Sequence, residues 1–592
     1  MPAIALTDGP SAPESFMSEP SLLKPSADPT PPHTAGTRKR LAVEDDAYAA
    51  WLDRAHEVVR SAEARTAAVP SPTNWIRLAQ AQYAAGEVSD AGNSAHTAMT
   101  EAIRLIESQQ CSASAMTLVL GSGANLLARS GRQAEAAVLL RRVGPPEVLE
   151  LTYASLLIDD ERLQDAFDAI TGANDPQADA MRGYILARQS ETQRAVHYLR
   201  KALREAPEDA DSVMNLASAY WRLGSRRKAI NTALRAARLA PSRQDISVSY
   251  MTLLLEDNQP DRVLAELKRL RRAGVVDSAR SLIVRCRAEL AVGDAKKALT
   301  FLRRAVAAAE NEGDTELRDE ASANLRVLEC STSGQDRAST RRVALECVKD
   351  APQNLAAVRQ LAAHSARRHE AHDLQQAIAN LGALPELARL DLEARLAYIR
   401  CDFEESLRVA ERIVELDPMA ADHCAMTVLL QGWHRGDWEA AARNASAWIK
   451  RAPFNDQLLN NAAYAMALGG MAAEALKVLD QHPEAEDFVP VATRGLAHLA
   501  LGELDAGMRW YRRAAEIAHA VGAGDMLTLM ALHQAAGLRK LGVTDVASEE
   551  FLAATSLPDT PLPADWDDQP GFVMIQQGCT REGWPWPPNL HL

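Results

Sequence analysis

Apolar and small residues recur along this chain with helical spacing, and two stretches repeat that spacing at an interval of 34 residues. In the first stretch the recurring positions are Arg182, Gly183, Leu186, Ser190, Ala195, Leu199, Ala202 and Pro207. In the second stretch they are Leu216, Ala217, Tyr220, Gly224, Ala229, Ala233, Ala236 and Pro241. The pattern predicts two helices per stretch, with their apolar faces turned toward each other.

Each recurring position has a physical reason. Small residues such as Ala217 and Ala229 let the two helices approach closely, and Gly224 permits a tight turn between them. Pro241 ends the second helix, because proline cannot continue one. The same frame returns from residue 72 onward, with further turns predicted at Gly86, Gly131, Glu161 and Gly293 and further ends at Pro418 and Pro453.

About fourteen copies cover residues 72–556, and the copies around 244–275 and 321–385 keep the period with poorer residues. The pattern resembles the tetratricopeptide repeat, a helix–turn–helix of 34 residues. The resemblance implies an all-α, right-handed superhelical solenoid of antiparallel helix pairs, with a concave groove lined mainly by the first helix of each pair. Because each pair leaves one apolar face uncovered, stacking of neighbouring pairs stabilises such a fold.

Composition divides the chain into four segments. Residues 1–40 are rich in proline, serine and threonine and cannot bury enough apolar surface to fold alone. Residues 41–71 are predicted to form an N-terminal capping helix, residues 72–557 the solenoid, and residues 558–592 a tail rich in proline and tryptophan.

Cysteine usage and the distribution of apolar residues indicate the cellular compartment of the protein. None of the seven cysteines lies in a C-x-x-C pair, which is typical of free thiols in a reducing compartment. The first residues lack a basic region followed by an apolar one, and no stretch of about eighteen apolar residues occurs. We therefore expect a cytoplasmic protein with no signal peptide and no membrane insertion.

Motifs for catalysis are missing from the sequence. No Ser/His/Asp order, phosphate-binding loop or dinucleotide fingerprint occurs, so we predict a protein that is not an enzyme and needs no cofactor. His364, His369 and His372 lie close together without the H-E-x-x-H spacing of a zinc site, and we interpret them as polar surface residues. Cys286 and Cys347 occupy small-residue positions of the repeat and are predicted to be buried structural thiols.

Charge is unevenly distributed. The whole chain has a formal charge of −14, whereas residues 181–310 contain 25 Lys and Arg against 14 Asp and Glu. This basic block (residues 181–310) has two interpretations that the sequence leaves open. Its cations either face the groove and dock a partner, or they solvate the second helix of each pair. The cations predicted on first helices are Arg182, Arg188, Arg222, Arg285 and Arg287.

The predicted partner-binding groove combines those cations with apolar residues. Its residues are Tyr184, Arg188, Met214, Trp221, Arg222 and Arg287. Aromatic and arginine side chains are frequent anchors of interfaces, so the expected ligand is a protein or peptide with an acidic or mixed acidic–apolar segment. Nucleic acid is disfavoured, since the overall negative charge would repel it.

The tail is predicted to be a docking segment, through Trp566, Trp584 and Trp586. Its Asp565, Asp567 and Asp568 would suit the basic block. Two roles remain open: the tail covers the apolar face of the last repeat, or it binds another subunit.

The function indicated is a protein-binding scaffold or adaptor. The alternatives are an accessory subunit of a bacterial polysaccharide synthesis or export machine or of a protein-glycosylation machine, a peptide-receiving regulator, and an enzyme without recognisable motifs. A regulator of that class usually carries a DNA-binding domain before the repeats, whereas residues 41–66 offer one helix. The oligomeric state stays open.

Overall fold

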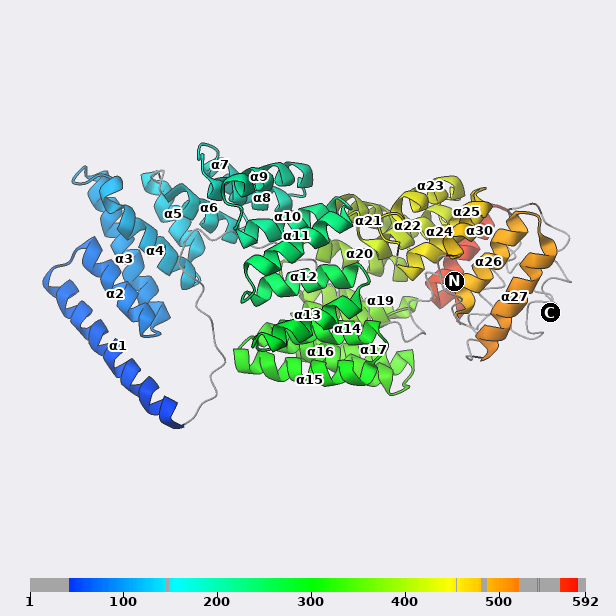
Figure 1. Cartoon of the computed structure of the whole chain (residues 1–592), viewed down its shortest axis with the longest axis horizontal. Helices are drawn as coiled ribbons and strands as arrows, with labels where there is room; N and C mark the ends of the chain where they lie inside the picture. The colour runs from blue at the N-terminus through cyan, green and yellow to red at the C-terminus, as the bar shows by residue number, and fades with distance from the viewer. Residues whose placement is uncertain are drawn as a thin grey trace. The chain divides into compact units, whose positions relative to one another are not determined.

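The computed structural model describes residues 42–144, 149–453, 455–480, 487–520, 540, 542 and 565–583. All regular elements within these ranges are helices, as Figure 1 shows. This confirms the predicted all-α repeat fold. Thirteen helix pairs, from α2/α3 to α26/α27, follow one another; the predicted copy at 537–554 lies almost entirely outside the described residues.

The chain divides into two compact units. In the described residues, the N-terminal unit comprises 42–220 and 231–240, and the C-terminal unit comprises 221–230 and everything from 241 onward. The helices of the N-terminal unit are α1 (Ala42–Ala68), α2 (Pro72–Ala84), α3 (Val88–Glu107), η2 (Ser114–Met116), α4 (Thr117–Arg129), α5 (Gln133–Val143), α6 (Glu150–Asp159), α7 (Leu163–Ala169), α8 (Pro176–Arg188) and α9 (Thr192–Glu205). Two further helices are shared by the units, α10 (Ala210–Arg222) and α11 (Arg226–Leu239).

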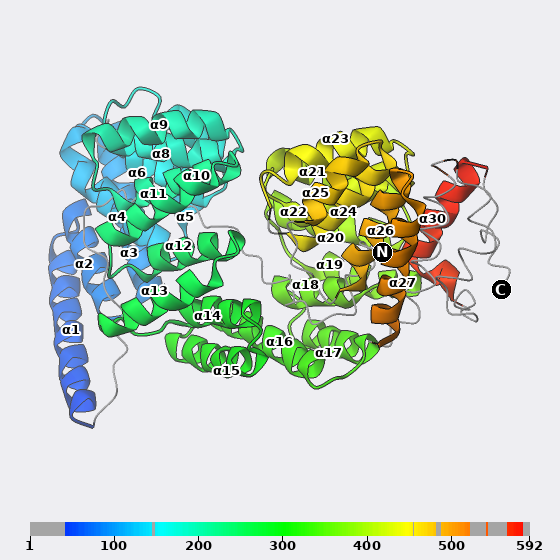
Figure 2. The same ribbon diagram turned by 45° about the vertical axis from the view of Figure 1, so that its right-hand side comes forward.

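The C-terminal unit contains the remaining elements. They are α12 (Gln244–Glu256), α13 (Pro260–Arg272), α14 (Ala279–Ala291), α15 (Ala295–Glu312), α16 (Thr315–Thr332), α17 (Arg337–Asp350), α18 (Leu355–His364), η4 (Arg368–Glu370), α19 (Ala371–Asn380), α20 (Glu386–Ile399), α21 (Phe403–Leu416), α22 (Ala421–Trp433), α23 (Trp438–Trp448), α24 (Asp456–Leu468), α25 (Ala472–Leu479), α26 (Phe488–Ala500), α27 (Leu504–Ala520), η5 (Trp566–Asp568) and α30 (Pro570–Arg581). Figure 2 shows α13 to α17 packed side by side in chain order, each against the next.

The pair α8/α9 shows how the repeat sequence makes its structure. The Asp175 carboxylate accepts hydrogen bonds from the backbone N–H groups of Gln177 (2.7 Å) and Ala178 (3.0 Å), which caps the start of α8. Leu199 of α9 packs directly on Gly183, where an added Cβ would lie 2.5 Å from the leucine Cγ. The small residue expected at this position is therefore required by the close approach of the two helices.

The turns within the pairs lie where the sequence predicts them. Gly86, Gly131 and Gly293 have φ angles of +88°, +78° and +83°, in the left-handed region that glycine adopts easily. Glu161 and Ser190 occupy the equivalent turn in two other pairs, at +59° and +62°. A polar residue can therefore replace glycine here, at a modest energetic cost.

The poorer stretch 321–385 contains parts of two helix pairs, and the second of them, α18/α19, has a different connection. The 3₁₀ turn η4 replaces the glycine turn between α18 and α19. The buried Glu370 carboxylate accepts hydrogen bonds from the N–H groups of Ala366 (2.7 Å) and Arg367 (2.8 Å), and from Arg337 (2.9 Å). A charged network thus holds this turn, which explains why the repeat pattern is poor here.

A helix can cross a bilayer only if it is long enough and apolar enough. Among the described residues, no helix combines the length and the apolar character needed to cross a bilayer.

Candidate functional site: a charged ladder on the A helices

The apolar residues predicted to line the groove lie in the core. Met214 is fully buried, and Tyr184 and Trp221 are 7% and 5% exposed. Tyr184 and Met214 belong to the N-terminal unit and Trp221 to the C-terminal unit. These side chains pack between helices, so they offer a partner almost no surface in this conformation.

The predicted cations are already engaged within the chain. Arg188 forms an ion pair with Glu161 (2.6 Å), and Arg287 forms one with Glu256 (2.9 Å). Arg222 lies close enough to Asp417 for its charge to oppose the effect of burial, which raises the pKa of that carboxyl group. The six predicted residues therefore do not form one exposed surface, although Arg287 belongs to the ladder described below.

The basic block lies mainly on the second helix of each pair, here called the B helix, whereas the first helix of each pair is called the A helix. The B helices α9, α11, α13 and α15 contain 18 Lys and Arg against 5 Asp and Glu, a net charge of +13. The A helices α8, α10, α12 and α14 contain 6 against 5, a net charge of +1. Of the two interpretations of the block, the structure favours cations on the B helices.

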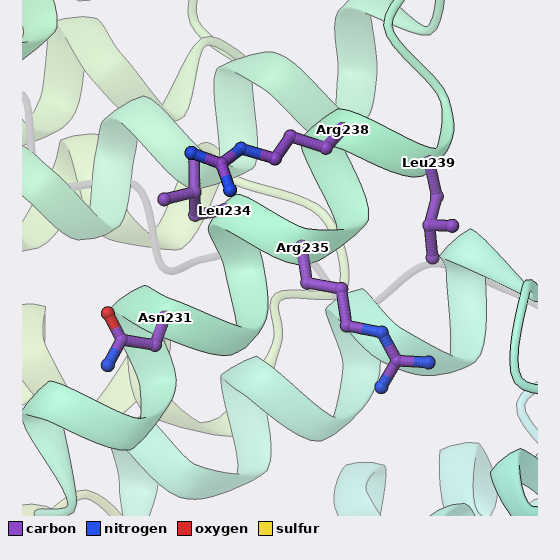
Figure 3. A pocket seen from close by; sticks show the side chains of 5 residues that line it. All are labelled: Asn231, Leu234, Arg235, Arg238 and Leu239. Carbon is purple, nitrogen blue, oxygen red and sulfur yellow. The ribbon is translucent and has the colours of Figure 1, made fainter.

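A hollow of about 370 Å³ lies on one of these B helices, α11. Figure 3 shows its lining residues, Asn231, Leu234, Arg235, Arg238 and Leu239. Arg235 also donates a hydrogen bond to the carbonyl oxygen of Pro207. Because a single helix supplies the whole lining, the hollow is an open surface with two guanidinium groups rather than an enclosed site.

Charged side chains of successive A helices contact one another in the C-terminal unit. Glu256 of α12 pairs with Arg287 of α14 (2.9 Å), at a separation of 31 residues. Farther along, Arg359 of α18 lies 3.6 Å from Asp391 of α20, and Asp391 lies 3.3 Å from His423 of α22. We call these five residues, together with Glu320 of α16, the charged ladder.

The ladder is enclosed by protein but still reaches solvent. The side chains of Glu256 and Arg287 are 14% and 11% exposed, and that of Asp391 is 40% exposed. Burial raises the pKa of Glu256, against the opposing effect of Arg287, and the negative charges of Asp422 and Asp417 raise it further. Asp422 lies in the first turn of α22 and Asp417 shortly before it.

Glu320 adds another carboxylate to this interior. Burial raises the pKa of Glu320, and the positive charges of Arg280, Arg359 and Arg287 oppose that rise. The ladder therefore presents charges of both signs in surroundings of reduced polarity. Charge-assisted hydrogen bonds to a ligand are stronger in such surroundings than on an open surface.

His423 has the most acidic surroundings of the ladder. Burial acts to lower its pKa, but the hydrogen bond and charge of Asp391, together with Asp422 and Asp417, outweigh burial and raise it. Burial acts in the opposite direction on Asp391, whose pKa is nevertheless lowered by His423, Arg359 and Arg395. Their contact therefore favours the imidazolium form of His423 and the carboxylate form of Asp391.

This arrangement predicts a pH-dependent stability. An unfolded histidine has a pKa of about 6.5, so the raised value in the fold contributes stability that is fully present below about pH 6.5. The contribution is lost as the pH rises through the folded-state pKa. Between pH 6.5 and 8.5 we expect the wild-type Tm to fall by roughly 1–3 °C more than that of His423→Gln.

The control for this measurement is His372→Gln, because His372 is exposed and contacts Gln376 (2.9 Å). Its Tm should follow the wild-type pH profile in differential scanning fluorimetry. Identical profiles for His423→Gln and the wild type would show that the His423–Asp391 pair does not titrate in this way.

The histidines considered for metal binding and the cysteines considered for thiol chemistry contact other residues of the chain. His364 is partly buried and not a surface residue as expected. It lies beside Arg337 and Arg395, and burial with these charges lowers its pKa to about 4. His369 pairs with Asp568 (2.5 Å). No group of three or more His, Cys, Asp or Glu in the described ranges is arranged to hold a metal ion. Cys286 and Cys347 are buried as predicted, and burial raises the pKa of both thiols.

Two aspartates of the tail contact a different part of the chain from the basic block predicted for them. Asp565 pairs with Arg367 (3.0 Å) and Asp568 with His369, so neither aspartate contacts the basic block. Trp566 is partly buried against the apolar cluster of the last repeats. Trp584 and Trp586 lie outside the described residues, and docking through these tryptophans stays a prediction.

Sequence reasoning missed most of the charged ladder. A signal was present, because Asp391 follows Arg359, and His423 follows Asp391, by 32 residues each. That interval is close to the repeat period and marks equivalent places on successive A helices. The signal was hidden because single charges on a helix are ordinarily solvated surface residues.

Comparisons with known proteins agree with the repeat fold. A family model described as tetratricopeptide repeat matches residues 210–243. Two solved structures of human IFIT1, a dimer with PPP-AAAA and a dimer with m7Gppp-AAAA, are 15% and 16% identical to this chain. They cover 79% and 76% of this chain and 95% and 90% of their own, with TM-scores of 0.31 and 0.32. Likeness at this level carries no functional argument. No curated protein sequence matches the chain.

Proposed function

We propose that this chain, an all-α repeat array whose residues 210–243 match a tetratricopeptide repeat model, is a non-enzymatic scaffold that holds a segment of a partner protein against the charged ladder. The observation that carries the proposal is the run of charged, partly exposed side chains on successive A helices, from Glu256 to His423. A fold stabilised by repeat stacking alone needs only apolar contacts there. Polar groups kept at such positions instead suit recognition of a polar ligand.

The expected ligand is an extended or helical protein segment with charges of both signs. The ladder combines carboxylates such as Glu256 and Asp391 with the guanidinium groups of Arg287 and Arg359, so an acidic ligand alone would meet repulsion. Binding should weaken as salt rises, because the outer ladder groups are screened over about 8–10 Å. This replaces the acidic or mixed acidic–apolar segment expected from the sequence.

A variant pair tests the proposal. Peptides selected from a phage-displayed library on the full chain supply the ligand, and fluorescence anisotropy measures their Kd. The double variant Arg359→Gln/Asp391→Asn removes one charge of each sign and leaves the net charge unchanged. We expect it to raise Kd at least about ten-fold, which corresponds to about 1.4 kcal/mol.

The matched control is Arg303→Gln/Glu329→Gln, an exposed ion pair of 2.6 Å whose side chains are 58% and 41% exposed. It should change Kd less than about two-fold, as surface pairs contribute little. Equal effects of the two double variants would place the binding surface elsewhere and refute the proposal.

A further inference from the structure

Residues 565–583 form a short segment that is bound by residues far earlier in the chain, with hydrogen-bond partners 147 to 199 positions away. Its helix α30 buries Phe572, Ile575 and Cys579, which are each at most 1% exposed. Their spacing places them on one face of the helix. That face joins an apolar cluster with Trp433 of α22 and Tyr464 of α24.

The contact between α30 and α22 is unusually close. Gly578 lies against Trp433, and a Cβ added to this glycine would be 2.8 Å from the indole Cε3 and 3.1 Å from the backbone oxygen. Neither distance leaves room for a side chain, and backbone cannot easily move away. The helix α30 therefore requires a small residue at position 578, where it packs against Trp433.

Polar contacts hold both ends of the segment. At its end, Arg581 donates a hydrogen bond to the carbonyl oxygen of Trp433 (2.8 Å) and another to that of His434. These carbonyl groups lie at the end of α22, where backbone acceptors lack partners within the helix. At its start, the Asp568 carboxylate accepts a hydrogen bond from the backbone N–H of His369 (2.8 Å).

We propose that the surface beneath α30 is a second binding site of the repeat array, and that α30 is its resident ligand within the chain. The site, here called the α30 seat, is formed by Arg367, His369, Trp433, His434 and Tyr464. It is separate from the charged ladder, since α22 carries His423 in its first turn and Trp433 in its last. The partner of this site is an amphipathic helix of another protein, which displaces α30.

The chemistry of α30 defines that partner helix. It needs two acidic residues before its first turn, one to pair with Arg367 as Asp565 does and one to accept a hydrogen bond from the N–H of His369 as Asp568 does. It needs an aromatic residue and an aliphatic one three positions later, as in Phe572 and Ile575, to fill the apolar part of the seat. A small residue must face Trp433, and an arginine near the end must reach the carbonyl groups of α22.

The test uses a fluorescent peptide of residues 565–583 as the probe and the full chain as the receptor. In the wild type the seat is occupied by the chain's own helix, which competes at high effective concentration. The variant Gly578→Val places a branched side chain against Trp433 and unseats α30. We expect this variant to bind the probe at least ten-fold more tightly than the wild type.

A second receptor keeps the test decisive if Gly578→Val disturbs the fold. Asp568→Asn/Arg581→Gln weakens the polar contacts at both ends and leaves the Asp565–Arg367 ion pair in place. Circular dichroism at 222 nm checks that the repeats remain helical. A probe that itself carries Gly578→Val should not bind to either receptor. Equal binding of the unmodified probe to wild type and both variants, or binding to none of them, would overturn the proposal.

The ladder variant Arg359→Gln/Asp391→Asn separates this site from the proposed function. Combined with Gly578→Val, it should bind the probe as Gly578→Val alone does. A ten-fold loss in the combined variant would contradict a separate α30 seat, whatever the ladder itself binds.

Discussion

Replacing Trp438 with alanine is expected to lower the free energy of unfolding of the C-terminal unit by about 3–5 kcal/mol. Trp438 is 5% exposed and packs edge-on against Trp433, at a centroid distance of 5.4 Å, and against Tyr464 at 5.5 Å. Its ring also fills the space beside Gly432, where an added Cβ would lie 2.1 Å from a ring carbon. Truncation therefore removes a large apolar surface and leaves a cavity that its rigid neighbours cannot fill.

Hydrogen exchange measured by mass spectrometry reports this effect locally, which suits a long repeat array whose parts can unfold separately. The amides of α22, α23 and α24 should exchange faster in Trp438→Ala, while those of α8 and α9 stay protected. Leu118→Ala is the control, because Leu118 is 76% exposed and should change exchange little. Unchanged protection of α22 to α24 would show that Trp438 does not hold these repeats together.

The second large effect is expected from Asp179→Ala in the N-terminal unit. Asp179 is 3% exposed and accepts a hydrogen bond from the buried Arg182 (2.7 Å), while Lys201 lies 2.8 Å from its other oxygen. Arg182 also donates hydrogen bonds to the carbonyl oxygens of Ile170, Thr171 (3.2 Å) and Ala173 (2.6 Å). Removing the carboxylate leaves a buried guanidinium without its counter-ion, at a cost of about 3–5 kcal/mol.

Hydrogen exchange of α8 and α9 measures this effect, and the C-terminal unit should keep its protection. The matched control is Asp165→Ala, which removes the acid of the exposed Arg162–Asp165 pair (2.5 Å, side chains 36% and 52% exposed). That change should cost at most about 1 kcal/mol. Similar effects of the two substitutions would mean that burial of the Asp179–Arg182 pair has no particular importance.

The helix pairs and their turns could be predicted from sequence because each depends on residues close together in the chain. Gly183 is small because Leu199 lies sixteen residues later in the same pair, and Gly293 is a glycine because its own φ angle is positive. Such local requirements repeat with the period of the fold, so they become visible as soon as two copies are aligned.

The surfaces could not be predicted in the same way. Whether a charged residue faces inward depends on contacts with the next repeat, as between Arg359 and Asp391, and the sequence shows only the interval. Met214 and Trp221 resemble interface anchors by residue type, yet inter-helix packing buries them. The position of α30 depends on hydrogen bonds to residues 147 or more positions away, for which no local pattern exists.

The central claim, that partners bind along the charged ladder, is tested most directly by mapping a bound peptide on the full chain. Hydrogen exchange with and without a library-selected peptide would show which helices gain protection. We predict slower exchange in the A helices α14, α18, α20 and α22, and no change in the exposed B helices α13 and α15. Protection confined to α13 and α15, with the A helices unchanged, would contradict the claim.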